Sequence, residues 1–273
     1  MKLTGNKDIV VVRGAGDIAS GTIHKMHRCG FKVLVLETEA PTAIRRKVSF
    51  SEAVYEGTCI VENIRAEKVR CISEITHCFR EKLIPVLVDP KGDIIPEIKP
   101  LAVVDAILAK KNTGTNKSMA EITIGLGPGF FAGKDVNIVI ETLRGHNLGK
   151  LIFEGCAEAN TGIPGNIKGY TSERVAYSKS QGKIEVYREI GSIVNKGDLI
   201  ASIGSQNITA SIDGLLRGIL RNDTYVKNGM KILDIDPRID EIQNCFTISE
   251  KARNIAGGVL EAVLYMINKN KEE

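Results

Sequence analysis

Three side chains capable of acid–base and anion chemistry follow one another closely in the middle of the chain: Glu141, Arg144 and His146. An imidazole can act as a general acid or base near neutral pH, and an arginine beside it can bind a carboxylate or a phosphate. We therefore take these three residues as candidate catalytic groups. The structural alternative is that Glu141 pairs with Arg144 while His146 decorates a turn.

A second candidate site is the stretch VVVRGAGDIASG, in which an apolar run ends in closely spaced glycines. Gly14, Gly16 and Ala19 fit the pattern G-x-G-x-x-G/A, and Glu37 follows at about the spacing of a ribose-binding carboxylate. Gly14 would permit a tight turn, and Gly16 would let the backbone approach a pyrophosphate. Because free N–H groups at a helix start attract anions, the pattern predicts a phosphate- or nucleotide-binding turn.

Charged residues around this turn have two interpretations each. Arg13 can grip a phosphate or carboxylate, or it can pair with Asp17 or another acid at the sheet edge. Asp17 can itself cap the free N–H groups in place of a phosphate. Further on, Arg45 and Arg46 begin a basic run that can contact a phosphate or simply form a solvated face.

A glycine-rich block precedes the Glu141 cluster. Gly127 and Gly129 lie near the end of an expected strand, where glycine indicates a tight turn or backbone approaching a ligand. Asp89 and Asp105 also end expected strands, where acids act as bases or metal ligands, or merely cap the next segment. The candidate ligand-binding residues are Arg13, Gly14, Gly16, Asp17, Glu37, Arg45, Arg46, Gly127 and Gly129.

The elements that must position these residues follow from the spacing of apolar residues. A β-branched run at 8–12, a helical spacing over 18–26 and a second run at 31–36 predict a β-α-β unit. Further strands are expected at 84–88, 101–105, 122–124 and 136–140, and a helix around 66–69. The pattern predicts an α/β domain with a Rossmann-like parallel sheet.

An internal repeat lies towards the C-terminus. Residues 182–203 align with residues 214–235, and each copy reads as a strand, a V-x-x-G turn and another strand. This arrangement resembles the barrel-sandwich hybrid of biotinyl and lipoyl domains. The stretch equivalent to their modified hairpin, residues 202–210, has no lysine. We therefore expect a binding or docking module and no swinging arm.

The chain ends in a predicted amphipathic helix. A capping box at 247–250 precedes apolar residues at helical spacing. Gly257 and Gly258 inside this helix lower its stability, so we expect close packing against a neighbour. The expected organisation is an α/β domain at 1–172, a β module at 173–237, and a C-terminal helix within 238–273 that packs back on the body.

Composition narrows the class of protein. Apolar residues make up 43% of the 273 residues, charged residues 26%, and the net charge is +4 without a basic block. There is no tryptophan and no long apolar segment, so we expect neither nucleic-acid nor membrane binding. The first residues lack the apolar core typical of a signal peptide, and six scattered cysteines read as reduced thiols without a metal site. We expect a cytoplasmic protein.

Long strings resemble one family across nearly the whole chain. These are VVVRGAGDIASGTIHK, LETEAPTAIRRKVSFSEAVYEG, IGLGPGFFAGKDVNIVIETLRGHNLG, NTGIPG and AGGVLEA. They look like the YqeB-type accessory proteins of selenium-dependent molybdenum hydroxylases, and the first half is distantly similar to XdhC-type maturation proteins. The resemblance implies a maturation factor whose partner is a xanthine dehydrogenase-like molybdenum hydroxylase. A molybdopterin-type cofactor would be its phosphorylated ligand.

Two other functions fit the residues. One is an NAD(P)-dependent oxidoreductase with Glu37 on the ribose and His146 as acid or base. The other is a non-catalytic scaffold whose β module docks a hydroxylase. No G-x-S-x-G, H-E-x-x-H or Walker A motif is present, so the sequence leaves open whether the protein is an enzyme. It also leaves open the oligomeric state, a homo-oligomer included.

Overall fold

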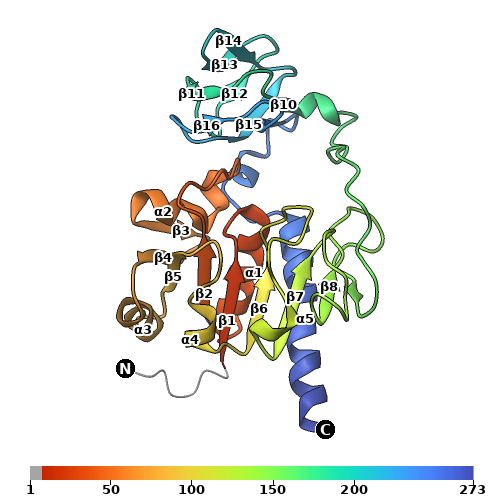
Figure 1. Ribbon diagram of the computed structural model, residues 1–273. Helices are drawn as coiled ribbons and strands as arrows, with labels where there is room; N and C mark the ends of the chain where they lie inside the picture. The colour runs from red at the N-terminus through yellow and green to blue at the C-terminus, as the bar shows by residue number, and fades with distance from the viewer. Residues whose placement is uncertain (1–7, 273) are drawn as a thin grey trace. The chain divides into compact units, whose positions relative to one another are not determined.

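The computed structural model describes residues 8–272, which form two compact units (Figure 1). Unit 1 contains residues 8–41, 50–160 and 248–272, and unit 2 contains residues 42–49 and 161–247. The sequence placed the second module at 173–237. The structural unit is longer at both ends and also takes the short segment 42–49 from the N-terminal part of the chain.

Unit 1 is built on a mixed sheet that is mostly parallel. Its described strands lie in the order β3-β4-β5-β2-β1-β6-β7-β8-β9, with β4 to β8 parallel and the two edge strands antiparallel to their neighbours. Their bounds are β1 (Ile9–Arg13), β2 (Lys32–Glu37), β3 (Thr58–Val61), β4 (Ile64–Val69), β5 (Ile84–Val88), β6 (Ala102–Asp105), β7 (Ile122–Leu126), β8 (Ile138–Ile140) and β9 (Leu151–Ile152). The continuous apolar runs become central strands because both faces of the sheet are covered.

Helices cover the two faces of this sheet. They are α1 (Asp17–Arg28), α2 (Ala53–Glu56), α3 (Ile72–Arg80), α4 (Ile95–Ile98) and α5 (Glu250–Glu272). On one face, Ile75 of α3 and Ile98 of α4 pack with Val11 and Leu34 of the sheet. On the other, α1 and α5 lie side by side (Figure 1), and α5 also contacts β7 and β8. The predicted β-α-β unit and the C-terminal helix are thus present.

The expected helix around 66–69 is wrong: these residues form β4. The reason is a tight turn at Glu62 and Asn63, both with positive φ, which joins β3 and β4 as a hairpin. Two successive residues of this conformation favour a two-residue hairpin loop, and asparagine tolerates it well. This turn signal outweighs a short and ambiguous apolar pattern.

Glycines allow α5 to approach its neighbours closely. A Cβ atom on Gly21 of α1 would lie 2.7 Å from the carbonyl oxygen of Ala252, and one on Gly258 would overlap the carbonyl oxygen of Gly149. The close packing expected of the α5 glycines is therefore confirmed at Gly258. At Gly257 the nearest atom would be the Nζ of Lys25 at 3.6 Å, which is ordinary contact.

Unit 2 consists of two four-stranded sheets, in the orders β10-β17-β15-β12 and β14-β13-β11-β16 among the residues described. Its strands are β10 (Val175–Tyr177), β11 (Gly182–Val186), β12 (Ile193–Val194), β13 (Leu199–Ile203), β14 (Gln206–Thr209), β15 (Gly214–Ile219), β16 (Tyr225–Val226) and β17 (Lys231–Asp236). Apolar side chains from both sheets form one buried core that includes Val194, Leu216 and Val226.

The internal repeat is confirmed strand by strand. β11, β12 and β13 of the first copy correspond to β15, β16 and β17 of the second. The copies exchange strands, because β11 pairs with β16 while β15 pairs with β12. Gly197 and Gly229 occupy the same position in the two V-x-x-G turns, and both have positive φ. The repeated sequence therefore encodes a repeated backbone conformation.

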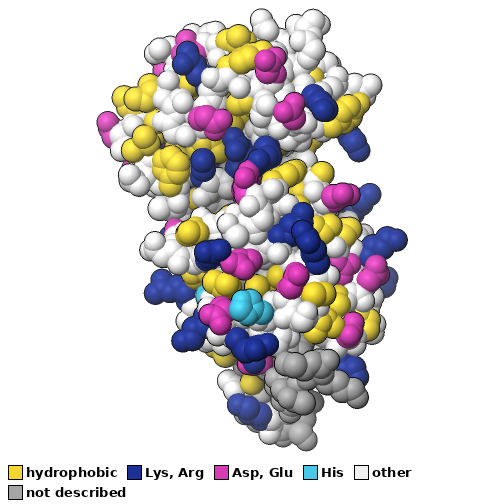
Figure 2. Space-filling model, turned by 90° about the vertical axis from the view of Figure 1, so that its left-hand side faces the viewer, with side chains coloured by type: hydrophobic (Ala, Val, Ile, Leu, Met, Phe, Trp, Pro, Cys, Tyr) yellow, Lys and Arg dark blue, Asp and Glu magenta, His cyan; other side chains and the backbone are white. Residues whose placement is uncertain are grey.

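Three further features concern the chain as a whole. Within residues 8–272, no helix combines the length and the apolar character needed to cross a membrane. All six cysteines are free thiols, as expected. Figure 2 shows basic and acidic side chains interspersed on the face that it displays, in keeping with the absence of a basic block.

Candidate functional site

The glycine turn lies where the strand order of the unit 1 sheet reverses. β1 pairs with β2 on one side and with β6 on the other. The turn is tied to both: the N–H of Gly14 donates to the carbonyl of Leu36 (2.7 Å), and the N–H of Ala106 donates to that of Arg13 (2.8 Å). Ligands of open α/β sheets bind at such reversal points, outside the carboxyl ends of the strands.

The backbone conformation and the surroundings constrain the two glycines of the turn differently. Gly14 has a φ of +93°, and a Cβ there would lie 3.0 Å from the carbonyl oxygen of Ala106. Gly16 has an ordinary extended conformation, with φ −65° and ψ 179°, and a Cβ there would meet nothing within 4 Å. Gly16 is the N-cap of α1, and no side chain caps the helix from that position. Glycine at 16 therefore leaves open space beside the start of the helix.

Arg13 is held by the protein at the adjacent strand end. Its side chain is only 1% exposed; one guanidinium nitrogen donates to the carbonyl of Pro90 (2.9 Å). The other lies 3.5 Å from Asp105 and hydrogen-bonds Thr115, whose hydroxyl donates to the same carboxylate (2.6 Å). Of the alternatives for Arg13, the structure contains the pairing with an edge acid.

The acids that end β5 and β6 act as caps in this structure. Asp89 accepts hydrogen bonds from the N–H groups of Gly92, Asp93 and Ile94 at 2.9 to 3.0 Å. Asp105, besides its contacts with Arg13 and Thr115, accepts from a backbone N–H two residues on. Both acids are thus engaged with the segments that follow their strands.

Glu37 ends β2 beside the glycine turn. Its carboxylate accepts the N–H of Thr38 (2.8 Å), and a hydrogen bond from the backbone of Ala15 places it at the turn. Burial raises the pKa of Glu37, and these two hydrogen bonds oppose the rise only in part. A ribose contact for Glu37 stays a prediction.

Lys251, which the sequence reasoning missed, lies in the same neighbourhood. It is half-buried in the first turn of α5. Burial and the nearby Arg144 lower its pKa, whereas Asp17 and Glu141 act in the opposite direction. A lysine in the first turn opposes the helix dipole, and this anomaly is the signal that would have singled it out.

The three candidate catalytic residues have different partners in this structure. Glu141 is buried, and its carboxylate accepts the N–H groups of Thr142, Leu143 and Glu158 at 2.7 to 2.8 Å, so it organises its own loop. Arg144 pairs with Glu250 of α5 and not with Glu141.

His146 is exposed and borders an open groove of unit 1. Lys25, which lines the same groove, lies eight residues beyond Asp17 along α1, or about 12 Å of helix. The structure therefore places His146 on this groove, and its predicted part in catalysis stays a prediction.

Gly127 and Gly129 both have positive φ and are closely packed. A Cβ on Gly127 would overlap the side chain of Thr142, and one on Gly129 would lie 2.7 Å from the backbone of Lys111. These contacts account for both glycines without a ligand. Their predicted part in ligand binding stays a prediction.

Arg45 and Arg46 belong to unit 2, where they bind backbone carbonyls. Arg45 is buried and donates to the carbonyls of Asn244 (2.7 Å) and Thr247 (3.0 Å). Arg46 donates to the carbonyl of Ile219 (2.9 Å), and its other end lies 3.4 Å from the Glu189 carboxylate. In this structure they fasten segment 42–49 to unit 2, and a phosphate contact for them stays a prediction.

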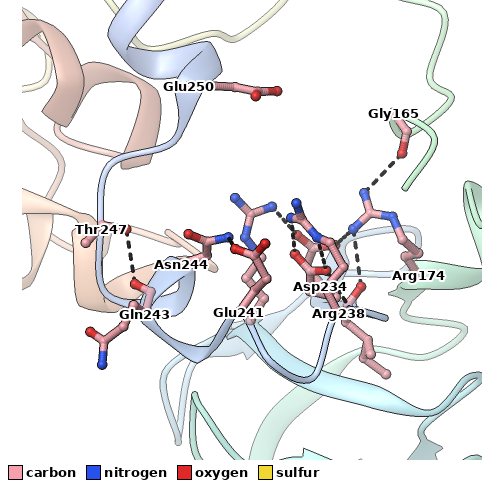
Figure 3. A network of polar contacts seen from close by, with 12 residues as sticks. Gly165, Arg174, Asp234, Arg238, Glu241, Gln243, Asn244, Thr247 and Glu250 are labelled. Atoms are coloured by element: carbon pink, nitrogen blue, oxygen red, sulfur yellow. Dashed lines mark hydrogen bonds and ion pairs between the residues drawn. The ribbon is translucent and has the colours of Figure 1, made fainter. Parts of the chain in front are cut away.

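A polar network in unit 2 contacts Gly165, the last residue of the NTGIPG segment (Figure 3). Arg174 donates to the carbonyl of Gly165 (3.2 Å) and to the Asp234 carboxylate (3.0 Å). Asp236 forms a two-pronged pair with Arg238 at 2.7 and 2.9 Å. Sequence reasoning did not identify Arg174, because its partner Asp234 lies in a distant strand.

Comparisons with known proteins give one strong match. The chain is 48% identical over 261 residues to the protein named "Uncharacterized protein YqeB" of Escherichia coli K12, which covers 96% of this chain and 48% of that protein. The chain thus spans about half the length of the curated relative it matches. No protein-family model matches the chain.

Two solved structures show a loose likeness. They are the product-bound ectoine utilization protein EutE (DoeB) of Ruegeria pomeroyi and a succinylglutamate desuccinylase of Silicibacter sp. TM1040. The first is 12% identical, with a TM-score of 0.26 over 84% of this chain and 85% of that one. The second is 10% identical, with a TM-score of 0.25 over 84% of each. Superpositions this loose place no constraint on fold or function.

Proposed function

Because the chain is a YqeB-type protein over the half of YqeB that it matches, we propose that unit 1 binds an anionic, nucleotide-like ligand at the glycine turn. We further propose that this ligand is a molybdopterin-type cofactor and that the protein serves the maturation of a molybdenum hydroxylase. The turn geometry supports the binding. The maturation role is supported by the sequence resemblance described above.

Gly16 is the observation that carries the binding proposal. Neither its φ nor its surroundings require glycine, and glycine is not favoured over serine or asparagine at an N-cap. Room for a ligand against the backbone is the reason we assign to the glycine at this position. The N–H groups of the first turn of α1 would then donate to a phosphate of that ligand, helped by the helix dipole.

Strand order supports a Rossmann-like interpretation of unit 1. Six of the parallel strands lie in the order β5-β2-β1-β6-β7-β8, with the glycine turn between the first strand and its helix. This is the 3-2-1-4-5-6 order of dinucleotide-binding sheets. Among the described residues, however, only short 3-10 turns or loops connect β6 to β7 and β7 to β8. Over residues 8–272, the half of the sheet that contains β6, β7 and β8 therefore lacks the connecting helices of a full dinucleotide-binding sheet.

The charged groups around the turn suit a phosphorylated ligand. Lys251 is the cation we assign to the phosphate, since Arg13 is engaged with Asp105. A point-like ammonium group suits a phosphate oxygen. Glu37 would accept a hydrogen bond from a hydroxyl of the ligand, such as a ribose hydroxyl.

One observation favours a second candidate, an NAD(P)-dependent oxidoreductase. The carboxylate of Glu37 lies at the turn, as a ribose-binding acid does, and an acid there favours NAD over NADP. In this candidate His146 would be the acid or base, and it would have to lie within hydrogen-bonding reach of the nicotinamide of a cofactor whose pyrophosphate is held at the turn. Binding of NAD(H) is thus the part of this candidate that geometry supports.

Unit 2 supports a docking role. Exchange of strands between the two copies of the repeat supports the proposal that unit 2 is a barrel-sandwich hybrid. The β13–β14 hairpin, with Gly204 and Ser205 at its tip, has no lysine. We propose that unit 2 is a binding module that contacts the hydroxylase. Co-purification of the hydroxylase that persists after the hairpin and its flanking strands are altered would argue against this.

Equilibrium binding tests the ligand proposal. Molybdopterin cytosine dinucleotide, NADH and NADPH are titrated into the full chain, into a Gly16→Asp variant and into a Gly204→Asn control. Aspartate at an N-cap stabilises a helix but occupies the anion position, so we expect Gly16→Asp to fold and to bind at least about tenfold more weakly. Gly204 has a φ of +56°, which asparagine tolerates, and its substitution should change nothing.

The three titrations also separate the candidates. Preference for molybdopterin cytosine dinucleotide supports the maturation proposal, and preference for NADH supports the oxidoreductase. Absence of binding by the unsubstituted chain, or equal binding by Gly16→Asp, would overturn the site itself.

A further inference from the structure

The groove that His146 borders is rich in cations and has no part in the function proposed above. It is open, with a volume of about 690 Å³, and its walls come from α1, from the loop between β8 and β9, and from α5. Lys25, Lys150 and Arg253 contribute positive charge, and Glu261 is the one acid in the lining. An excess of positive charge in a concave surface attracts anions.

These cations have capacity left for a ligand. In the part of the chain that the structure describes, no hydrogen bond or ion pair engages the Lys25 or Lys150 ammonium groups or the His146 imidazole. Arg253 is oriented by the carboxylate of Glu62, which also accepts the N–H of Ile248 (2.7 Å). A guanidinium has five N–H donors, so one anchoring bond leaves others for a ligand.

Gly257 keeps the floor of this groove open. Glycine inside a helix is unfavourable compared with alanine, and packing does not require it here. The adjacent Gly258 shows the contrast, since a Cβ there would overlap the carbonyl oxygen of Gly149. The nearest atom to a Cβ on Gly257 would be the Nζ of Lys25, at 3.6 Å. The space that a side chain would fill therefore lies directly beside an unengaged cation.

We propose that this groove is a second anion site, separate from the glycine turn, and that it takes a small phosphorylated molecule. Lys25, Lys150 and Arg253 would share the oxygens of its phosphate group, because a multiply charged anion is needed to satisfy three cations. Glu261 would accept a hydrogen bond from a hydroxyl of the same molecule. Lys25 lies eight residues beyond Asp17 along α1, or about 12 Å of helix, whereas Arg253 lies only two residues from Lys251 on α5. Lys25 is therefore the cation that distinguishes this site from the glycine turn.

Isothermal titration with inorganic pyrophosphate at low ionic strength tests this site. The full chain carries Gly16→Asp in every sample, so that the glycine turn does not bind pyrophosphate. Loss of binding in this series therefore reports on the groove alone. We expect one pyrophosphate per chain. Replacing both Lys25→Gln and Lys150→Gln should weaken binding at least about tenfold, because charge-assisted hydrogen bonds are lost.

Two further variants make the result specific. Gly257→Leu should weaken binding to a similar degree by filling the floor, while thermal unfolding shows that the helix is retained. The control replaces Lys82→Gln and Lys134→Gln, two exposed lysines of unit 1 outside the groove lining, and should bind within about twofold of the parent. Absence of pyrophosphate binding by the parent, or equal losses in the control, would overturn the proposal.

Discussion

Gly14 and Gly16 lie in the same turn, but different physical factors account for the glycine at each position. Gly14 needs its positive φ and its contact with Ala106, whereas nothing in the fold requires a glycine at 16. The sequence pattern predicts both positions but cannot distinguish them, because the contact at Gly14 comes from the loop after β6, far along the chain. Only Gly16 is therefore informative about a ligand.

The side-chain contacts of Arg13 also depend on residues distant in sequence. Sequence reasoning identified the ion pair as one alternative, yet the partners Asp105 and Thr115 follow a different strand. Arg13→Met leaves the buried Asp105 without its cation and should lower the free energy of unfolding by about 3 kcal/mol. Urea unfolding measures this loss.

A double variant is the control for Arg13. Arg13→Met combined with Asp105→Leu removes both charges together, and should lose less stability than the single variant, because no uncompensated buried charge remains. Losses that simply add would show that the pair is not a coupled unit.

Replacing Lys251 should change the free energy of unfolding and the affinity for the ligand in opposite directions. Burial lowers its pKa below that of the unfolded chain, so the unfolded chain binds more protons between the two pKa values. The contribution of Lys251 to the free energy of unfolding therefore rises with pH through that window, which ends at pH 10.5, the ordinary pKa of a lysine. Lys251→Met should remove this pH dependence, raise the free energy of unfolding at pH 7 and weaken ligand binding.

Urea unfolding between pH 7 and pH 10, with parallel ligand titration, measures both effects of Lys251→Met. Loss of stability at pH 7 would indicate that attraction between Lys251 and the carboxylates of Asp17 and Glu141 outweighs its burial. Unchanged ligand affinity would remove Lys251 from the site.

At the scale of elements, α5 contains a matched pair of glycines. Gly258→Ala forces a Cβ against the carbonyl oxygen of Gly149 and should lower the free energy of unfolding by about 1 to 3 kcal/mol. Gly257→Ala has room and should raise it by up to about 1 kcal/mol. Thermal unfolding compares the two. Equal effects would mean that the packing of α5 is looser than described.

Local patterns predicted most of the elements but not all. The runs of β1, β2, β5, β6 and β7 are continuous and apolar because both faces of the sheet are covered, and such runs are hard to mistake. β4 is buried only at every third residue, Ala66 and Val69, and this spacing is compatible with a helix as well as a strand. Its identity depends on the turn at Glu62 and Asn63, which a periodicity argument does not consider.

At the scale of the whole molecule, the sequence shows the internal repeat. It does not show that segment 42–49 belongs to unit 2. The two copies share turn glycines and buried positions because they adopt the same conformation. Segment 42–49 joins unit 2 through tertiary contacts alone: the N–H of Ile219 donates to the carbonyl of Ile44, and Gly218 lies against that residue. No local pattern encodes such a partner.

Segment 42–49 should therefore be needed for the stability of unit 2. Arg45→Ala removes two charge-assisted hydrogen bonds to the carbonyls of Asn244 and Thr247, at a cost of about 2 to 3 kcal/mol. Hydrogen exchange should become faster at the amides of β15 and β17 and remain unchanged in β1 and β6. Equal acceleration in both units, or none, would contradict this assignment.

The central claim is that Gly16 is glycine because a phosphorylated ligand lies against it. The most direct test is the affinity of the full chain and of Gly16→Asp for molybdopterin cytosine dinucleotide, measured together with their thermal stability. We predict equal or higher stability for the variant, with binding at least about tenfold weaker. Equal affinity in a folded Gly16→Asp variant would contradict the claim.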